Sequence, residues 1–225
     1  MGIDLGIGNR IRPYGAINFG TAGCFGQNDK GKVFLMTCDH VIKTHAVPEE
    51  GPWKIYLPFN HPFKEKIAVF EGKSLITEQK KIADIAAVRT LVDVPRPSLL
   101  PQPVPVNGIN RVTGITEPFP GIEVLLWGAR TEAYHSGVIL SPSKKYAWPH
   151  GKYGTVTYDL QFSVSIKPDF IPEVGDSGGY VITTSGELVG LLAALSGVVT
   201  DAGNTIIHCV PLKSCVQLLN LQILL

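Results

Sequence analysis

The chain has few cysteines, and they show no pairing pattern. There are four of them, at Cys24, Cys38, Cys209 and Cys215. None of their spacings is the C-x-x-C of a typical zinc or redox site, so free buried thiols are expected. Two weaker alternatives stay open: a disulfide between Cys24 and Cys38, which flank a predicted hairpin, and a zinc site recruiting His40 or His208 beside a cysteine pair.

The chain also lacks a charge excess and a long apolar run. Its 20 Lys and Arg residues balance 19 Asp and Glu residues, so the composition favours neither nucleic acid nor an anionic membrane as partner. The longest apolar stretch, 188–199, is shorter than the ~20 residues of a membrane-spanning helix. The start, MGIDLGIGNRIRPYG, has no signal-peptide pattern. We therefore expect a soluble, cytoplasmic protein.

Helical periodicity is confined to the C-terminus, whereas strand signals recur along the chain. Pro211 suits a first helical position, and apolar residues follow it at spacings of three to four. Strict alternation of apolar and polar residues over 155–166 predicts one half-buried strand. Further short strands are expected at 32–37, 85–92, 122–128, 180–184 and 188–195. Many short strands indicate a barrel or a sandwich.

A proline-rich stretch divides the chain. Five prolines interrupt PRPSLLPQPVP at 95–105, a composition that disfavours sheet interiors and favours an extended connector. We therefore predict an N-terminal β subdomain over 1–94, a linker over 95–106 and a C-terminal β subdomain with a terminal helix over 107–225.

The stretch EVGDSGGYV, residues 173–181, combines a serine with a dense set of glycines. Glycine costs backbone entropy, so such a turn usually needs positive φ or a close backbone approach. One reason to need it is an oxyanion hole, in which backbone N–H groups bind the negative oxygen formed when a hydroxyl attacks a carbonyl carbon. Ser177 would supply that hydroxyl.

A serine nucleophile needs a base within hydrogen-bond reach and a group that orients the base. His40, in FLMTCDHVI, follows an apolar strand and is the best-placed histidine, although taken alone it could be purely structural. Asp84, in KKIADIAAVRT, stands at the start of an apolar strand, where a buried carboxylate needs a partner such as an imidazole N–H. Asp39 is expected to be exposed or in a turn.

These motifs resemble those of the chymotrypsin-like (trypsin-like) serine peptidases, in the manner of intracellular and bacterial members that lack N-terminal activation. MTCDHVI resembles the histidine motif of that family, ADIAAV its aspartate motif and GDSGG its serine motif, in the same chain order. The resemblance implies an all-β fold of two perpendicular six-stranded antiparallel β-barrels with a C-terminal helix. His40 and Asp84 would lie on the first barrel and Ser177 on the second.

The resemblance also implies a role for each residue. His40 would take the proton of Ser177 and return it to the leaving amine, while Asp84 holds the imidazole tautomer. The backbone amides of Gly175 and Ser177 would form the oxyanion hole. Neither a metal nor an organic cofactor is expected.

Three positions depart from the family pattern. No apolar N-terminal sequence is present to pair with Asp176, so either the domain folds directly into an active state or something else, such as an activating partner, orders the site. Cys38 is displaced relative to the usual cysteine beside the histidine, so the usual disulfide is not expected there. Tyr180 replaces a common proline.

The resemblance is least informative about specificity. By family position, Ile171 would lie at the base of the primary pocket. Its wall would be formed by Ala193, Ala194 and Leu195. This lining favours a small or apolar residue before the cleaved bond. His208 could instead reach the pocket and favour Gln or Glu through a hydrogen bond, or it could be a core histidine satisfied by the backbone.

The sequence therefore predicts a serine endopeptidase that acts on protein or peptide substrates, directed at specific proteins, with no nucleic-acid or membrane partner. A protease-like peptide-binding module that is silent or activated by a partner is the alternative from another class, because fold alone does not establish catalysis. An esterase built on the same residues is a third hypothesis.

Overall fold

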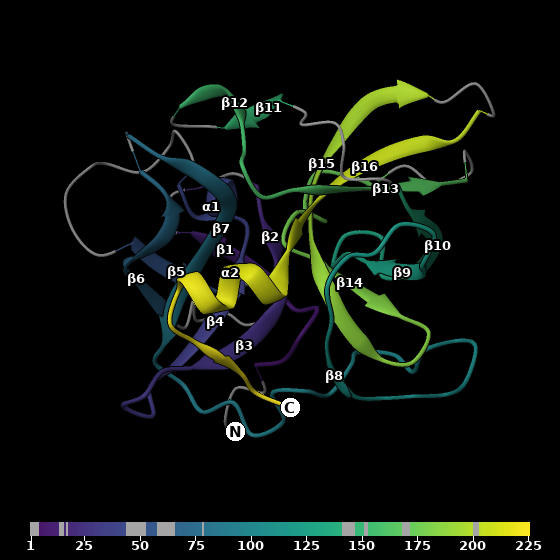
Figure 1. Cartoon of the computed structure of the whole chain (residues 1–225). Helices are drawn as coiled ribbons and strands as arrows, with labels where there is room; N and C mark the ends of the chain where they lie inside the picture. The colour runs from purple at the N-terminus through teal and green to yellow at the C-terminus, as the bar shows by residue number, and fades with distance from the viewer. Residues whose placement is uncertain are drawn as a thin grey trace.

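The structure, a computed structural model, describes residues 5–13, 16, 18–43, 53–57, 66–77, 79–140, 147–150, 153–167, 172–199 and 203–225. The strands of this part of the chain form two large sheets and one small one (Figure 1). None of the helices within it has the length and apolar character needed to span a bilayer.

The first sheet is built almost entirely from the N-terminal part of the chain. Its strands are β1 (Arg10–Pro13), β2 (Gly20–Thr21), β3 (Cys24–Gln27), β4 (Val33–Thr37), β5 (Trp53–Tyr56), β6 (Lys66–Ile76), β7 (Lys81–Thr90) and β17 (Gln222–Ile223). They are ordered β17-β3-β4-β7-β6-β5-β1-β2. A one-turn helix, α1 (Asp39–Ile42), directly follows β4.

The second sheet closes into a barrel. Its strands are β8 (Gly114–Ile115), β9 (Glu123–Trp127), β10 (Tyr134–Ile139), β13 (Phe162–Ile166), β14 (Tyr180–Thr183), β15 (Glu187–Val199) and β16 (Thr205–Pro211). Six of them run in the order β14-β9-β10-β13-β16-β15, and β15 pairs back with β14. β8 adds to β15 in parallel. Together with the first sheet and the C-terminal helix, this closed barrel confirms the expected double-barrel fold.

The prediction of one continuous strand over 155–166 is wrong. The chain forms β12 (Gly154–Thr157), breaks at 158–161 and continues as β13. At the break, the N–H groups of Asp159 and Leu160 donate to the carbonyls of Lys81 and Ile82 in the first sheet. Within the described residues, β12 pairs only with β11 (Ala147–His150), in a separate hairpin. The alternating pattern was real, but long-range backbone bonds divide it between two sheets.

The other expected strands and the C-terminal helix are confirmed within one to four residues. Pro211 is the N-cap rather than the first residue of α2 (Leu212–Leu218), whose buried side chains include Leu212, Cys215 and Val216. After this helix the chain returns to the first sheet, where β17 pairs with β3. The sequence offered no signal for this return. The subdomain boundary at 95–106 stays a prediction.

Two apolar clusters fill the molecule. Val124, Leu126, Val164 and Ile207 belong to the one that draws only on the second barrel. The larger cluster contains residues of both sheets, such as Leu35 and Val88 from the first and Tyr180 and Leu191 from the second. The two sheets are therefore held together by shared apolar packing, which also positions the residues between them.

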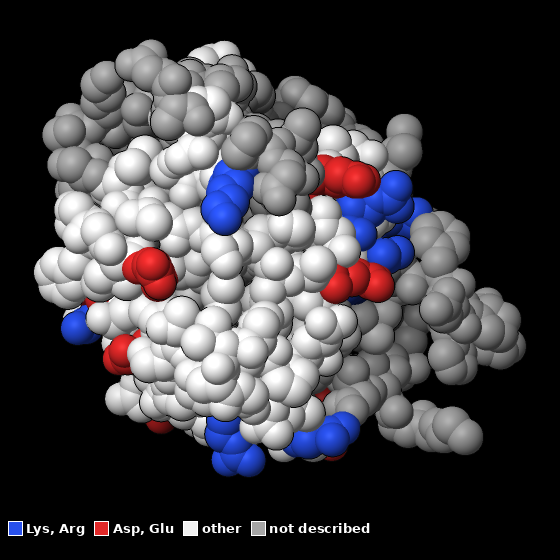
Figure 2. Space-filling view, turned by 90° about the vertical axis from the view of Figure 1, so that its right-hand side faces the viewer, with Lys and Arg blue, Asp and Glu red and all other residues white. Residues whose placement is uncertain are grey.

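On the outer side of the second barrel, uncharged residues cover most of the described surface. Figure 2 shows this side as mainly uncharged, with acidic and basic side chains both present and partly next to each other. No single sign dominates the face in view, in agreement with the balanced composition.

Candidate active site

His40 and Asp84 meet on the first sheet. His40 lies in α1, directly after β4, and Asp84 lies on β7, the strand that pairs with β4. The backbone N–H of His40 donates to Oδ1 of Asp84 at 3.0 Å. The imidazole Nδ1 lies 2.6 Å from Oδ2 of the same carboxylate. The carboxylate thus fixes both the backbone and the ring of His40 and selects the tautomer with the proton on Nδ1.

Burial and charge act against each other in this pair. The Asp84 side chain is fully buried and that of His40 is 22% exposed. Burial alone would raise the pKa of Asp84, but the charge and hydrogen bonds of His40 outweigh it and lower that pKa. Burial likewise opposes protonation of His40, yet the charge and hydrogen bond of Asp84 raise the pKa of His40 above 6.5.

Ser177 lies on the second barrel, just before β14, and faces the first sheet. Its carbonyl accepts the N–H of Thr21 at 2.8 Å. A Cβ added at Gly20 would lie 2.4 Å from Cγ1 of Val41 and 3.1 Å from the Ser177 carbonyl, so Ser177 lies close to the residue after His40. The two predicted triad segments therefore face each other across the junction of the sheets.

The hydroxyl of Ser177 does not donate to His40 in this structure. It donates instead to the carbonyl of Ala193 on β15, at 3.2 Å, and no hydrogen bond joins Ser177 and His40 within the described residues. Catalytic hydrogen bonds are often long or misaligned without substrate. A rotation about the Cα–Cβ bond of Ser177 would be needed to redirect the hydroxyl.

The loop before Ser177 contains a glycine whose backbone has positive φ and lies close to a side chain of the first sheet region. Gly175 has φ +117°, and a Cβ there would lie 2.6 Å from the ring of Phe19. The carbonyl of Gly175 accepts the hydroxyl of Thr21 at 2.9 Å, which fixes the direction of that peptide. Among the described residues, no protein acceptor binds the N–H of Gly175 or of Ser177. The role of these two N–H groups as an oxyanion hole stays a prediction.

The buried Asp176 finds its partners within its own chain. Its Oδ1 accepts the backbone N–H groups of Arg130 and Thr131 at 2.8 and 3.0 Å, and its Oδ2 accepts the N–H of Glu173 at 2.9 Å. Three such bonds satisfy a carboxylate well. Asp176 was the acid without an obvious partner in the sequence, and the turn after β9 supplies that partner.

The predicted specificity residues are only partly visible. Ile171 lies outside the described residues, as do the side chains of Ala194 and Leu195, whose backbone pairs with His208 and Ile207. The side chain of Ala193 is buried. The pocket that these residues were expected to form stays a prediction.

His208 is buried beneath another aromatic ring. Its Nδ1 lies 3.2 Å from Oγ of Ser163, and its ring stacks on Trp148 with a centroid distance of 5.4 Å. Burial lowers the pKa of His208 to about 4. If buried, His208 was expected to bind a backbone group. The structure shows a side-chain partner, the hydroxyl of Ser163.

Sequence reasoning missed a cluster on the β11–β12 hairpin. The indole Nε1–H of Trp148 donates to Oδ2 of Asp84 at 3.1 Å, and Nε2 of His150 lies 3.0 Å from Oδ2 of Asp39. Two positions apart on a strand, Trp148 and His150 share a face. That spacing in AWPH was the available signal.

The expectation for Asp39 is wrong. Its side chain is fully buried and pairs with Lys43 at 3.0 Å as well as with His150. The expectation assumed an extended chain, on which Asp39 and His40 would point to opposite faces. The chain is helical here, and the side chain of Asp39 instead meets the hairpin.

The four thiols are free and buried, as expected. Burial raises the pKa of each, and the thiol of Cys38 donates to the carbonyl of Leu192 at 3.2 Å. The disulfide considered between Cys24 and Cys38 is not formed.

Three side chains at the site have donor atoms close enough to bind one metal ion. The donor atoms of Cys38, His40 and Asp84 lie within 4.8 Å of one another. The short contact between His40 and Asp84 already occupies two of the three groups.

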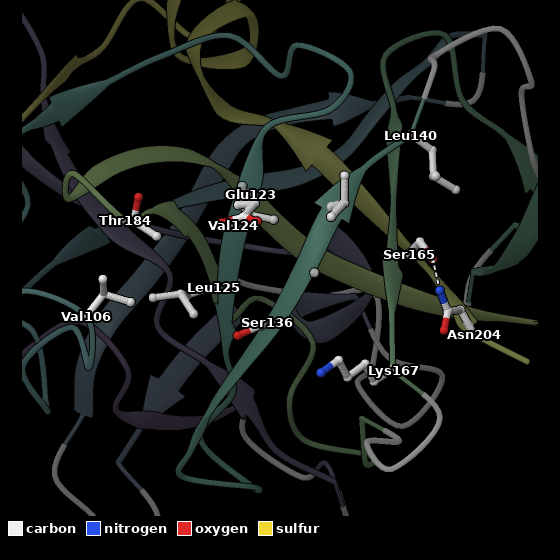
Figure 3. Close-up of a pocket in the computed structure, with 12 residues that line it drawn as sticks. Val106, Glu123, Val124, Leu125, Ser136, Leu140, Ser165, Lys167, Thr184 and Asn204 are labelled. Atoms are coloured by element: carbon white, nitrogen blue, oxygen red, sulfur yellow. Dashed lines mark hydrogen bonds between the residues drawn. The ribbon is translucent and has the colours of Figure 1, made fainter. Parts of the chain in front are cut away.

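A hollow of about 500 Å³ lies elsewhere, on the outside of the second barrel (Figure 3). It is lined by side chains of β9, β10 and β13, among them Leu125, Ser136 and Ser165. The hydroxyl of Ser165 accepts a hydrogen bond from Asn204. None of the predicted site residues lines this hollow, so it is separate from the candidate active site.

No family model and no curated protein matches this sequence. Solved structures do match. The Nocardiopsis protease NAPase is 18% identical, with 98% of this chain and 99% of that chain covered and a TM-score of 0.68. The Cellulomonas bogoriensis chymotrypsin is 22% identical, with 99% of both chains covered and a TM-score of 0.65.

A glutamic acid specific serine protease is also similar, at 17% identity, with 98% of this chain and 100% of that chain covered and a TM-score of 0.67. At these identities the likeness concerns the fold, and it extends over nearly the whole chain. Together with the closed barrel, the second sheet and the terminal helix, it identifies the architecture: this chain has the chymotrypsin-like serine protease fold.

Proposed function

We propose that the protein is a serine endopeptidase in which Ser177 is the nucleophile, His40 the general base and acid, and Asp84 the residue that orients His40. The observation that carries the proposal is the 2.6 Å contact between Nδ1 of His40 and the buried carboxylate of Asp84. It leaves Nε2 of the ring as the basic nitrogen. Ser177 belongs to the second barrel and lies close to Val41, the residue after His40.

The chemistry follows from these positions. When substrate enters, the hydroxyl of Ser177 leaves the Ala193 carbonyl and gives its proton to Nε2 of His40 while Oγ attacks the peptide carbonyl carbon. The N–H groups of Gly175 and Ser177 stabilise the resulting oxyanion. The C–N bond then breaks, and His40 donates the proton to the leaving amine. Water, activated by His40, hydrolyses the acyl-enzyme and restores Ser177.

For specificity we propose a pocket built around Ile171, Ala193, Ala194 and Leu195 that takes a small or apolar residue. A second possibility involves His208. One similar structure is a glutamic acid specific protease that uses a histidine triad in substrate binding. Against a direct role here, His208 is buried under Trp148 and already contacts Ser163. Substrate profiling decides between an apolar and an acidic or amide preference.

A silent or partner-activated peptide-binding module is the second candidate. The bond from Ser177 to the carbonyl of Ala193 favours it, because this hydroxyl is directed away from the base. The three backbone bonds to Asp176 favour the enzyme, since they hold the loop before Ser177 in place. We propose protein or peptide substrates in either case, in the cytoplasm.

Labelling with a fluorophosphonate probe near neutral pH tests the proposal. We expect the wild type to react and Ser177→Ala and His40→Ala not to react, with circular dichroism showing that all three are folded. A folded wild type that stays unlabelled would reject the enzyme and favour the module, and labelling of Ser177→Ala would reject Ser177 as the nucleophile. Digestion of a mixed proteome then separates specific substrates from general proteolysis, and a broad cleavage pattern would contradict the expected specificity.

A further inference from the structure

The β11–β12 hairpin belongs to the second barrel by sequence but contacts the first sheet. It lies in the connection between β10 and β13 and pairs with neither. Figure 1 shows it at the end of the molecule where α1 lies. Its buried side chains reach the two acids beside the candidate site: Trp148 contacts Asp84, and His150 contacts Asp39.

Trp148 binds the same oxygen that orients His40. Oδ2 of Asp84 lies 2.6 Å from Nδ1 of His40 and 3.1 Å from Nε1 of Trp148, whereas Oδ1 accepts the backbone N–H of His40. Within the described residues, Trp148 is the only group outside His40 that donates to this carboxylate. Such an outer donor restricts how a carboxylate can rotate and shares its negative charge.

The indole ring is itself held firmly. It is 2% exposed and contacts two other rings, Tyr158 at a centroid distance of 4.4 Å and His208 at 5.4 Å. Directly after the hairpin, the N–H groups of Asp159 and Leu160 bind the carbonyls of Lys81 and Ile82, which precede Asp84 on β7. The donor and its acceptor are therefore anchored to each other through both the backbone and the ring stack.

We infer that Trp148 is a positioning residue: its indole N–H fixes the carboxylate of Asp84 and thereby the ring of His40, so that a hairpin of the second barrel completes the His–Asp pair of the first. This inference rests on the proposed function for its effect on catalysis. The contact itself is a property of the folded chain and can be tested without substrate.

Trp148→Phe removes the donor and keeps most of the ring packing. Tyr158→Phe is the matched control, because it changes the neighbouring ring of the stack and removes a buried hydroxyl that has no hydrogen-bond partner among the described residues. The ionisable groups beside the pair are the same in both variants: Asp39 on α1, Lys43 directly after α1 and His150 on β11.

Two readouts separate positioning from packing. In a Ser177→Ala background, NMR titration of the His40 imidazole needs no activity. Loss of a donor concentrates negative charge on Oδ2, so we expect Trp148→Phe to raise the midpoint by roughly half a pH unit, with no change in Tyr158→Phe. In the active protein, we expect kcat to fall about tenfold in Trp148→Phe while KM is unchanged.

Equal effects of the two variants on both readouts, or an unchanged His40 titration in Trp148→Phe, would overturn the inference. If Trp148→Phe does not fold, 3-benzothienylalanine at position 148 replaces the N–H by sulfur in a ring of nearly the same shape, and the same criteria apply. An inactive wild type whose His40 midpoint still depends on the donor at 148 would reject the proposed function and keep the inference. An active wild type whose His40 midpoint does not depend on the donor at position 148 would reject the inference and keep the proposed function.

Discussion

The imidazole Nδ1 of His40 lies 2.6 Å from Oδ2 of Asp84, and the backbone N–H of His40 binds the other oxygen of the same carboxylate. Because the carboxylate is fully buried, its charge acts on the ring with little screening by solvent. This relationship raises the pKa of His40 and lowers that of Asp84. The pH dependence of both activity and stability follows from it.

We expect the rate to rise with pH through a His40 pKa above 6.5, because the base must be neutral. Conversely, the raised pKa of His40 stabilises the fold below pH 6.5, and this contribution is lost as the pH rises through the pKa in the fold. The pH profile of kcat/KM measures the first effect, and the pH profile of the free energy of unfolding measures the second.

In Asp84→Asn, the rise of kcat/KM on the acid side of the profile should move to lower pH, and the rate should drop by about 10³- to 10⁴-fold. An unmoved rise would contradict the pairing.

Asp176→Asn tests whether the backbone bonds to the Asp176 carboxylate order the loop before Ser177. Asn retains one acceptor but turns an N–H₂ group toward a backbone N–H, so we expect a loss of about 1–3 kcal/mol in unfolding free energy and strongly reduced fluorophosphonate labelling. The control is Glu173→Ala in the same loop, which removes an exposed ion pair with Arg130 and should leave the free energy of unfolding almost unchanged. Wild-type labelling in Asp176→Asn would show that other contacts order the loop.

Gly175→Ala tests the backbone form of that loop. The new Cβ would meet the ring of Phe19 at 2.6 Å, and φ at this position is +117°. A displaced N–H donor should lower kcat by about 100-fold or more. Phe19→Ala combined with Gly175→Ala removes the collision but not the φ strain. We therefore expect kcat of the double variant to recover only in part toward that of Phe19→Ala alone. Full recovery in the double variant would assign the whole effect to the collision.

The buried His208 predicts a loss of stability in acid. Its pKa is lowered to about 4, so between pH 6.5 and 4 the unfolded chain takes up a proton that the folded chain excludes. The fold should lose up to roughly 3 kcal/mol over this interval as the pH falls. His208→Asn cannot take up this proton, and the difference between the two unfolding curves isolates the effect. Parallel curves for wild type and His208→Asn would argue that the ring is accessible to water.

The local part of this protein was predictable from sequence. Short strands were expected at 180–184 and 188–195, and they form as β14 and β15, because strand preference depends on neighbouring residues. The short motifs around His40, Asp84 and Ser177 identified the residues that the fold brings to the junction of the two sheets. Their chain order, with the resemblance they carry, led to the double-barrel fold.

The tertiary structure decided which distant groups surround those residues. Backbone carbonyls of β7 break the alternating stretch after β12, the turn after β9 satisfies Asp176, and the hairpin brings Trp148 to Asp84. None of these contacts follows from residue spacing. Each joins segments more than 40 residues apart, and a buried polar group is stabilised by whichever donor or acceptor the packing of the two sheets brings within about 3 Å.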